Sequence, residues 1–283
     1  MAKRRACRKP SCVVCGSALR YRGAMKLVLI QPQLAYDVRA DNLAAVARML
    51  DPLAGRLVPG DLVLLPEHVD LRASRMLYEQ AVCALAKRLG CHVVGGSHHE
   101  ERGAQRVNAG VVSDPGGQVI ASYEKLRPYA DERSRVVQGQ HLGEVAIGGK
   151  QLLIVICADF WFSDVFARAS ALPDLVLVPA HSVSRKPKPD YSRALWRHLA
   201  VARAYEFGVF VGVSDWAYAP NPNGLPASGV GGFADPSVVD PDALFVPIDA
   251  DYRVYDLDFE RLQTFRRDRV VRGFFWRSLS TPP

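Results

Sequence analysis

The sequence lacks any long hydrophobic run. Although 49% of its 283 residues are hydrophobic, no stretch reaches the roughly 18 consecutive apolar residues that a transmembrane helix needs. Residues 1–24 also lack the apolar run of about 7 to 15 residues found in a secretory signal peptide. These absences argue against a membrane protein and a secreted protein, so we expect a cytoplasmic protein with no membrane partner.

Acidic residues are absent from the start of the chain. Residues 1–24 carry seven basic residues and no acidic one, which leaves 29 basic and 29 acidic residues in the rest. The net charge of +7 therefore belongs to this segment, and the body is formally neutral. A neutral body offers no extended basic face for phosphate groups, so the sequence argues against nucleic acid as a partner.

Cysteines are too few for a disulfide framework. Three lie in the body and three in the N-terminal segment. Three cysteines in a body of this size are typical of reduced thiols. The six residues are Cys7, Cys12, Cys15, Cys83, Cys91 and Cys157.

The N-terminal cysteines have one alternative interpretation, as metal ligands. Cys12 and Cys15 in a C-x-x-C spacing, with Cys7 upstream, offer three thiolates, whereas a structural zinc site uses four ligands. From the body, only His98 or His99 is a candidate for the fourth ligand. We favour the simpler interpretation, in which these cysteines are incidental features of a flexible segment.

From Met25 onward, strand and helix patterns alternate. The apolar runs KLVLIQ and DLVLLPE are typical of buried strands, and Asp41 and Ser74 are candidate N-caps for the helices that follow them. In the middle of the chain, strand patterns flank the turn signals DPGG and GG, which predicts two hairpins. Alternation then resumes with a strand at 175–179 and a helix at 190–206. The pattern predicts an α/β layered fold.

The chain divides into three parts. Residues 1–24 form a flexible basic tail outside the fold. No linker-like stretch interrupts residues 25–255, so the sequence predicts a single domain there. Residues 256–283 combine aromatic and other apolar residues with many arginines, and we expect them to pack on the body or on a partner subunit. A segment of this kind predicts a homodimer or a higher oligomer.

Three strands end in reactive side chains. Strand patterns deliver Glu67, Lys125 and Cys157 at or just past their carboxyl ends, where open α/β sheets present groups to a cleft. A carboxylate, an ammonium and a thiol are a base, an oxyanion stabiliser and a nucleophile, the set needed for acyl transfer. Taken singly, each has an ordinary alternative: a buried core cysteine, a capping carboxylate and a surface lysine.

Together these segments resemble a known family. LPE at 65–67, SYEKLRPYADE at 122–132 and ICADFWFSD at 156–164 are similar, in order and separation, to the glutamate, lysine and cysteine motifs of the nitrilase superfamily of carbon-nitrogen hydrolases. The segments RVNAGVVSDPGGQVIASYEK and ARAYEFGVFVGVS also resemble family landmarks. The resemblance covers residues 25–255.

The resemblance implies a four-layer α-β-β-α sandwich and a cysteine hydrolase of non-peptide C–N bonds that forms a thioester acyl-enzyme. In this assignment Glu67 is the general base, Lys125 stabilises the tetrahedral intermediate and Cys157 is the nucleophile. Glu132 matches a second glutamate that helps to position substrate or to relay protons, and the main-chain N–H of Ala158 is a second oxyanion donor. The family chemistry implies no metal and no organic cofactor.

The sequence departs from the family pattern after the nucleophile. The family usually carries Arg-Phe-Pro-Glu where this chain has Trp-Phe-Ser-Asp at 161–164, and Ser214 and Gly231 stand where asparagine and serine are frequent. We expect these positions to shape the pocket without supplying the three chemical roles. They leave the substrate open among a small amide, an N-carbamoyl compound and a nitrile.

Three other functions compete with this hydrolase. A papain-like Cys–His pair is disfavoured because no histidine stands in a recognisable triad context. An acyltransferase of the same superfamily would let an amine replace water. A catalytically altered interaction protein would keep the fold alone, and the retention of all three reactive residue types argues against it.

Deletion of residues 1–24 tests their exclusion from the fold. Because the strand pattern begins at Met25, a candidate for the natural start, we expect thermal stability and activity to stay nearly unchanged. A fall in melting temperature of more than about 5 °C, on the order of 1 to 2 kcal/mol for a chain of this size, would contradict the prediction.

Overall fold

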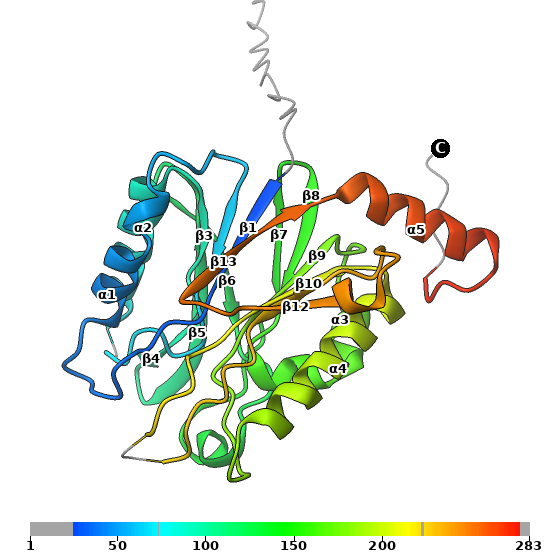
Figure 1. Cartoon of the computed structure of the whole chain (residues 1–283). Coiled ribbons are helices and arrows are strands. Elements are labelled where there is room, and N and C mark those ends of the chain that lie inside the picture. Colours follow the sequence, from blue (N-terminus) through cyan, green and yellow to red (C-terminus); the bar gives the residue numbers. More distant parts are fainter. Residues whose placement is uncertain (1–24, 73, 222–223, 278–283) are drawn as a thin grey trace, which may run out of the picture.

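A computed structural model of the chain describes residues 25–72, 74–221 and 224–277 (Figure 1). Residues 1–24, predicted to be a flexible tail, and their three candidate zinc ligands lie outside the described residues. Within the described ranges, no helix combines the length and the apolar character needed to cross a membrane.

Two sheets form the centre of the molecule. The first has the strand order β13-β1-β2-β3-β5-β4. Strand β6 is outside this order and pairs with β5. Strands β1, β2 and β3 are parallel, and β5 runs antiparallel to both β3 and β6. The strands are β1 (Met25–Ile30), β2 (Leu62–Leu64), β3 (His92–Val94), β4 (His98–Arg102), β5 (Gln105–Ser113), β6 (Val119–Glu124) and β13 (Tyr252–Leu257).

The second sheet has the order β12-β11-β10-β9-β8-β7. Its strands β8, β9 and β10 are parallel, whereas β7, β11 and β12 join by antiparallel pairing. The strands are β7 (Gly143–Ile147), β8 (Lys150–Ile154), β9 (Leu175–Pro179), β10 (Phe210–Ser214), β11 (Gly232–Ala234) and β12 (Phe245–Pro247).

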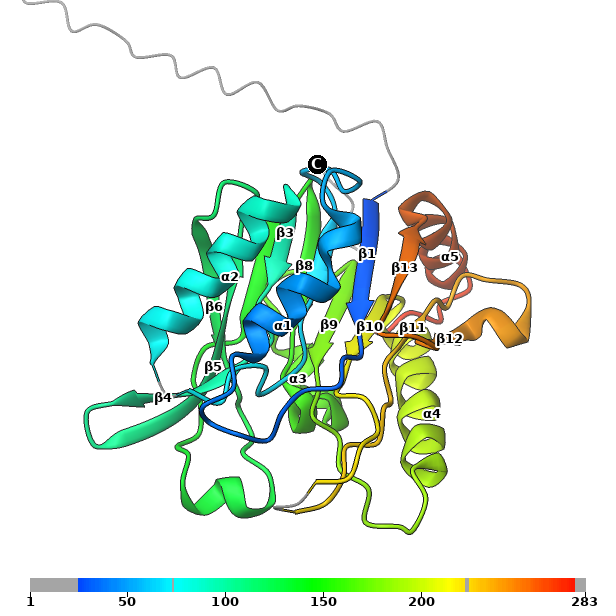
Figure 2. The ribbon, with the colours of Figure 1, turned by 60° about the vertical axis from the view of Figure 1, so that its left-hand side comes forward.

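Helices cover the outer faces of both sheets. Figures 1 and 2 show α1 and α2 over the first sheet and α4 over the second. The α-helices are α1 (Asn42–Met49), α2 (Arg75–Leu89), α3 (Ser163–Ala167), α4 (Asp190–Phe207) and α5 (Phe259–Val271). Short 3-10 helices are η1 (Asp51–Leu53), η2 (Ala130–Ser134), η3 (Cys157–Trp161) and η4 (Pro241–Leu244).

Alternation along β1 explains the layering. Leu27 and Leu29 lie in the core between the sheets, whereas Val28 and Ile30 pack in a second core with residues of α1 and α2. Opposite β1, a Cβ on Gly212 of β10 would lie 2.8 Å from Leu27 Cδ2, so glycine permits the close approach of the sheets. The predicted four-layer α-β-β-α sandwich is confirmed.

Ser214 joins the two sheets. Its hydroxyl donates to the Leu64 carbonyl of β2 at 2.8 Å and accepts from the Ile30 N–H of β1 at 2.9 Å. The side chain is fully buried. Ser214 therefore connects the sheets inside the core, whereas its departure from the family pattern leads us to expect a pocket-lining position.

The N-caps predicted for the first two helices are confirmed. Asp41 accepts from the N–H of Ala44, and Ser74 accepts from the N–H of Leu77. The strand expected over 61–67 is shorter, because only Leu62–Leu64 pair with neighbours on both sides.

Helix α5 lies in the C-terminal segment, where the sequence pattern predicts no helix. Its buried side chains include two arginines as well as Phe259 and Leu262, so it shows no clear apolar stripe. Arg266 compensates its burial by donating to Asp174 Oδ1 at 2.7 Å and to the Gly208 carbonyl at 2.6 Å. The predicted boundary between 255 and 256 falls inside β13.

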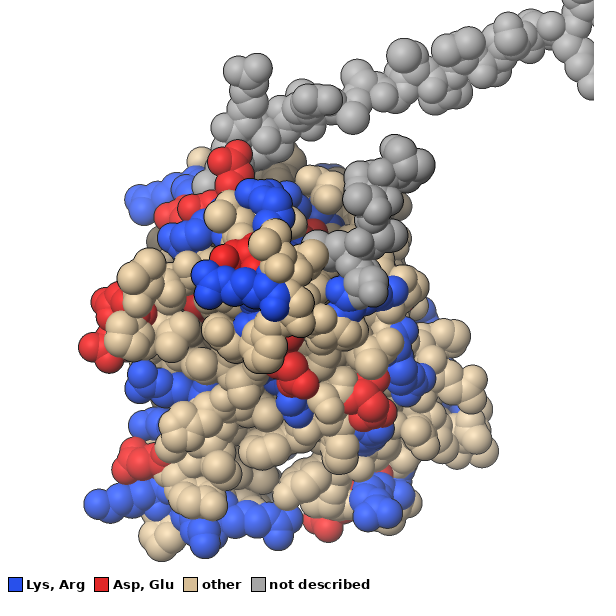
Figure 3. Space-filling model, turned by 90° about the vertical axis from the view of Figure 1, so that its right-hand side faces the viewer, with Lys and Arg blue, Asp and Glu red and all other residues tan. Residues whose placement is uncertain are grey.

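Charged side chains of both signs are distributed over the surface. On the face shown in Figure 3, Lys and Arg side chains are interspersed with Asp and Glu side chains. This mixture agrees with the neutral charge of the chain beyond its first 24 residues.

Two glycines with similar backbone angles provide a matched stability test. Gly96 (φ 67°) and Gly103 (φ 62°) are both left-handed, but a Cβ on Gly96 would overlap the Pro66 carbonyl, whereas no atom lies within 4 Å of one on Gly103. Gly103→Ala should cost only the left-handed backbone strain, about 1 to 2 kcal/mol.

Gly96→Ala should cost several kcal/mol in addition, because backbone must move to relieve the overlap. Thermal unfolding measures both, at roughly 2 to 4 °C per kcal/mol for a chain of this size. Equal melting temperatures for the two variants would contradict the packing described around Pro66.

Candidate active site

Three strand ends meet at one edge of the sandwich. Glu67 lies three residues after β2, Lys125 directly follows β6, and Cys157 begins η3 just after β8. Strands β2 and β6 run in the same direction, so their carboxyl ends share an edge of the first sheet. The second sheet contributes Cys157 from across the interface.

Glu67 is held from several sides. Its side chain is 2% exposed, and Oε1 accepts from Lys125 Nζ at 2.7 Å and from Asn108 Nδ2 at 2.9 Å. Its main chain is also fixed, because the N–H donates to the Ala180 carbonyl and the carbonyl accepts from Trp216 Nε1 at 2.8 Å. The carboxylate therefore has a single, well-defined position.

Lys125 lies between two carboxylates. Its Nζ donates to Glu67 Oε1 at 2.7 Å and to Glu132 Oε2 at 2.5 Å, and the side chain is 3% exposed. Glu132, on η2, also accepts from Asn108 Nδ2 at 2.8 Å and from His99 Nε2 at 2.9 Å. The structure thus brings the predicted Glu132 into direct contact with Lys125.

Cys157 occupies a strained turn. Its φ is 44°, a left-handed value that costs a non-glycine residue about 1 to 3 kcal/mol and that tends to occur at functional sites. The Sγ atom lies 3.9 Å from the His181 carbonyl oxygen. The turn lies between the end of β8 and η3, and strained strand-to-helix turns of this kind carry the nucleophile in α/β hydrolases.

Asp159 connects the cysteine turn to the lysine loop. Its two carboxylate oxygens accept from the main-chain N–H groups of Leu126 at 2.9 Å and Arg127 at 2.7 Å. Burial raises the pKa of Asp159 to about 6, against the lowering effect of these hydrogen bonds. Through this contact the backbone beside Lys125 is attached to the backbone beside Cys157.

The electrostatics define where the protons are. Burial, and then the neighbouring Glu67 carboxylate, raise the pKa of the Cys157 thiol well above its ordinary value. Burial is the largest influence on Glu67 and raises its pKa, but the Lys125 charge, the neighbouring His68 and the hydrogen bond from Lys125 together outweigh it and keep that pKa below the usual range. At neutral pH the resting site therefore holds a protonated thiol beside an ionised carboxylate.

Lys125 stays charged in the same environment. Burial favours the neutral amine, yet the charges of Glu67, Cys157 and Glu132 raise the pKa of Lys125 above its ordinary value. Burial likewise opposes the ionisation of Glu132, while the His99 hydrogen bond and the Lys125 charge lower its pKa.

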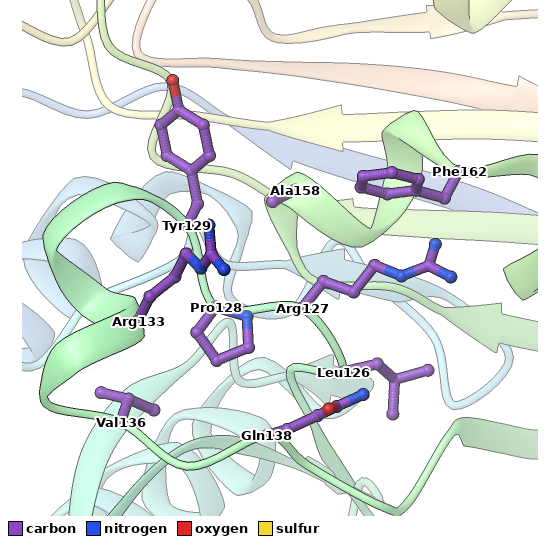
Figure 4. Close-up of a pocket in the computed structure, with 9 residues that line it drawn as sticks. All are labelled: Leu126, Arg127, Pro128, Tyr129, Arg133, Val136, Gln138, Ala158 and Phe162. Atoms are coloured by element: carbon purple, nitrogen blue, oxygen red, sulfur yellow. The ribbon is translucent and has the colours of Figure 1, made fainter.

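A cavity opens beside the cysteine. It has a volume of about 520 Å³, and Ala158, the residue after Cys157, forms part of its wall (Figure 4). Figure 4 shows the residues that line this cavity: Tyr129 and Arg133 come from the segment after β6, and Phe162 comes from the end of η3. The guanidinium of Arg127 lies over the Phe162 ring, 4.0 Å from its centroid. Phe162 is the one position of 161–164 that keeps the family residue, and the departing positions 161, 163 and 164 do not line this cavity.

Three contributors to the site were not identified from the sequence: Asn108, His99 and Asp159. Asn108 is fully buried in β5 and bridges the two glutamates. An asparagine between apolar neighbours in a strand was a usable signal, because a buried amide needs hydrogen-bond partners. His99 faces Asn108 across the β4–β5 pair, a placement that depends on strand register.

The histidines proposed as partners for the N-terminal cysteines have other environments. His98 is fully buried and stacks on Tyr78 at a ring distance of 4.1 Å, so it is not available as a ligand from solvent. His99 instead forms, with His68 and Glu132, a group whose potential ligand atoms lie within 4.8 Å of one another.

Asp159→Asn tests the link between the two loops. An asparagine has one acceptor oxygen where the aspartate uses two, so one buried N–H of Leu126 or Arg127 should lose its partner, at a cost of about 1 to 3 kcal/mol. Thermal unfolding should show a fall of several degrees. Asp164→Asn is the control, because Asp164 pairs with Arg127 at the surface and its loss should change the melting temperature by less than about 2 °C.

Comparisons with known proteins show which fold and family this chain shares. Three solved structures illustrate the likeness, although a search among curated proteins gave no match. The CN-hydrolase superfamily protein XC1258 from Xanthomonas campestris is 21% identical, with 92% of this chain and 99% of that chain covered and a TM-score of 0.71. Nit3 of Saccharomyces cerevisiae, a member of branch 10 of the nitrilase superfamily, is 18% identical, with 87% and 94% covered and a TM-score of 0.71.

A variant of the amidase from Nesterenkonia sp. AN1, in complex with butyramide, is 24% identical. The alignment covers 91% of this chain and all of that chain, with a TM-score of 0.68. At these identities the likenesses show a shared fold. Residues 29–244 match the carbon-nitrogen hydrolase family, and because this match spans most of the sequence, the chain belongs to that family, within the nitrilase superfamily.

Proposed function

We propose that the protein hydrolyses the C–N bond of a small amide through a thioester on Cys157. The observation that carries this proposal is the buried Lys125 ammonium, which bridges Glu67 and Glu132 beside a protonated thiol. A base, a fixed cation and a nucleophile at one point are the parts that acyl transfer requires.

The first step uses the resting protonation states. When the amide carbon approaches Sγ, Glu67 takes the thiol proton as the S–C bond forms. The carbonyl π electrons move to oxygen, and the resulting oxyanion is stabilised by Lys125 and the main-chain N–H of Ala158. Both donors are fixed before the reaction, so little reorganisation is needed when the charge develops.

The second half returns the site to its starting state. Glu67 gives its proton to the nitrogen as the C–N bond breaks, and the amine or ammonia leaves while the thioester remains. Glu67 then takes a proton from a water molecule that attacks the thioester carbon. Collapse of the second tetrahedral species releases the carboxylic acid and returns the proton to Sγ.

Glu132 acts in this scheme as a positioning residue. With Glu67 as its single carboxylate partner, the Lys125 ammonium would lose its ion pair when Glu67 takes up a proton. The contact at 2.5 Å between Lys125 Nζ and Glu132 Oε2 holds the ammonium in place through that change. The hydrogen bonds from Asn108 and His99 in turn hold Glu132.

An amide is favoured over the N-carbamoyl and nitrile alternatives by the relatives. The Nesterenkonia protein is described as an amidase and was solved with acrylamide and with butyramide. The cavity beside Ala158 is of the size that small-molecule sites have. A cytoplasmic location and a homo-oligomeric state remain predictions for this chain.

Intact-mass measurement after exposure to panels of small amides and nitriles tests the reaction. The wild-type chain should gain the mass of an acyl group, and Cys157→Ala should fold normally and gain none. Glu67→Gln should slow acylation and deacylation by at least ~100-fold. Lys125→Met should be nearly as damaging, since loss of an oxyanion donor costs about 3 kcal/mol, and Glu132→Gln should be milder.

Cys83→Ala is the matched control, because Cys83 is a half-buried thiol away from the strand ends and should leave the adduct unchanged. Circular dichroism should show that every variant is folded. Wild-type turnover by Cys157→Ala would refute the assignment of the nucleophile, and an unreactive Cys157 in the wild type would favour a binding protein that retains only the fold.

A further inference from the structure

Beside the proposed reaction centre lies a cluster of three potential metal ligands, of which the mechanism uses Glu132 and, through it, His99. His68, His99 and Glu132 come from three separate segments, and one potential ligand atom from each lies within 4.8 Å of the other two. The ring centroids of the His68 and His99 imidazoles are 4.4 Å apart, and the two ring planes make an angle of 73°. The side chains of His68 and His99 are 17% and 32% exposed, so solvent reaches the cluster.

The fold determines each of the three positions. His68 follows Glu67 directly and has a left-handed backbone with φ of 55°. His99 alternates along β4 with the buried His98 and therefore faces the opposite side of the sheet. Glu132 is on η2, where its Oε2 also accepts from the main-chain N–H of Tyr129 at 3.1 Å.

The positioning of Glu132 explains only one of the two histidines. His99 Nε2 donates to Glu132 Oε1 at 2.9 Å, which is a sufficient role for His99. His68 Nε2 lies 3.7 Å from Glu67 Oε1, beyond hydrogen-bonding distance, so that contact does not explain an imidazole at this strained position.

Two imidazoles and one carboxylate are a ligand set that zinc uses, with a water molecule in the fourth position. Ligand atoms about 2.0 to 2.2 Å from zinc lie about 3.3 to 3.6 Å apart in a tetrahedron, a spacing that small side-chain rotations from the present separations would reach. The charge is also suitable, because the one ammonium of Lys125 balances only one of the two carboxylates beside it.

We propose that His68, His99 and Glu132 form a binding site for a divalent transition-metal ion of the zinc type. The fourth ligand is a water molecule from the exposed side. Since Glu132 also contacts Lys125, an ion bound there competes with the ammonium for the carboxylate. Occupancy therefore inhibits the hydrolysis, a consequence that rests on the proposed function, whereas the binding itself does not.

Calorimetric titration with zinc chloride tests the binding. The protein is the full chain carrying Cys7→Ser, Cys12→Ser and Cys15→Ser, because those thiols could themselves bind zinc. We expect one zinc ion per chain. His68→Asn and His99→Gln should each weaken binding by at least ~10-fold, the loss that even outer-sphere changes cause at metal sites.

The variants are chosen so that the protein still folds. Asparagine tolerates the left-handed backbone of His68 better than alanine does, and circular dichroism monitors both variants. His198→Ala is the matched control, because His198 is exposed on α4 and its loss should leave binding unchanged. Absence of zinc binding, or equal binding by wild type and His68→Asn, would overturn the proposal.

Cys157→Ala distinguishes this site from the neighbouring thiol. Zinc binding should persist in this variant, and its loss would place the ion on Cys157 and refute the three-residue site. Inhibition is measured separately on any substrate the amide panel reveals, where zinc should inhibit the wild type more strongly than His68→Asn. Zinc binding without any acyl-enzyme would refute the proposed hydrolase alone and leave the metal site supported.

Discussion

The site depends on one buried ammonium between the buried carboxylate of Glu67 and the partly buried carboxylate of Glu132. Inside a protein, an unpaired charge carries a desolvation cost of several kcal/mol, so Lys125 is tolerated there only because Glu67 and Glu132 both contact its Nζ. The same contacts decide the protonation states. They keep Glu67 ionised while burial keeps the Cys157 thiol protonated, and these are the protonation states that the proposed base and the proposed nucleophile need before proton transfer.

The sandwich architecture makes this arrangement possible. The first sheet supplies Glu67 and Lys125 at its edge, and the second supplies Cys157. The packing of the two sheets therefore sets the distances between these three side chains. Ser214 connects the sheets near this edge by bonding to β1 and β2, and Asp159 connects the loops that follow β6 and β8. Close packing and these hydrogen bonds thus hold the three side chains at fixed distances from one another, which no single loop could do.

Three histidines surround the site at the strand ends. At 24% identity or less, the likeness to the three solved structures shows the shared fold alone. Around Glu67, Lys125 and Cys157 lie His68, His99 and His181, and the cavity wall includes Arg127 and Phe162. Two imidazoles and a carboxylate are a ligand set that zinc uses, so the proposed metal site lies in this part of the structure.

The sequence by itself determined the alternation of strands and helices, the N-caps at Asp41 and Ser74 and the strand-end positions of Glu67, Lys125 and Cys157. These features are local, because periodicity and capping depend on residues a few positions apart. Only the tertiary structure decided that Asn108 and His99 both reach Glu132, since strand register joins residues from different strands, or that α5 forms around buried arginines. Such contacts join residues that are far apart in the sequence, and they stabilise the protein only once the two sheets have packed.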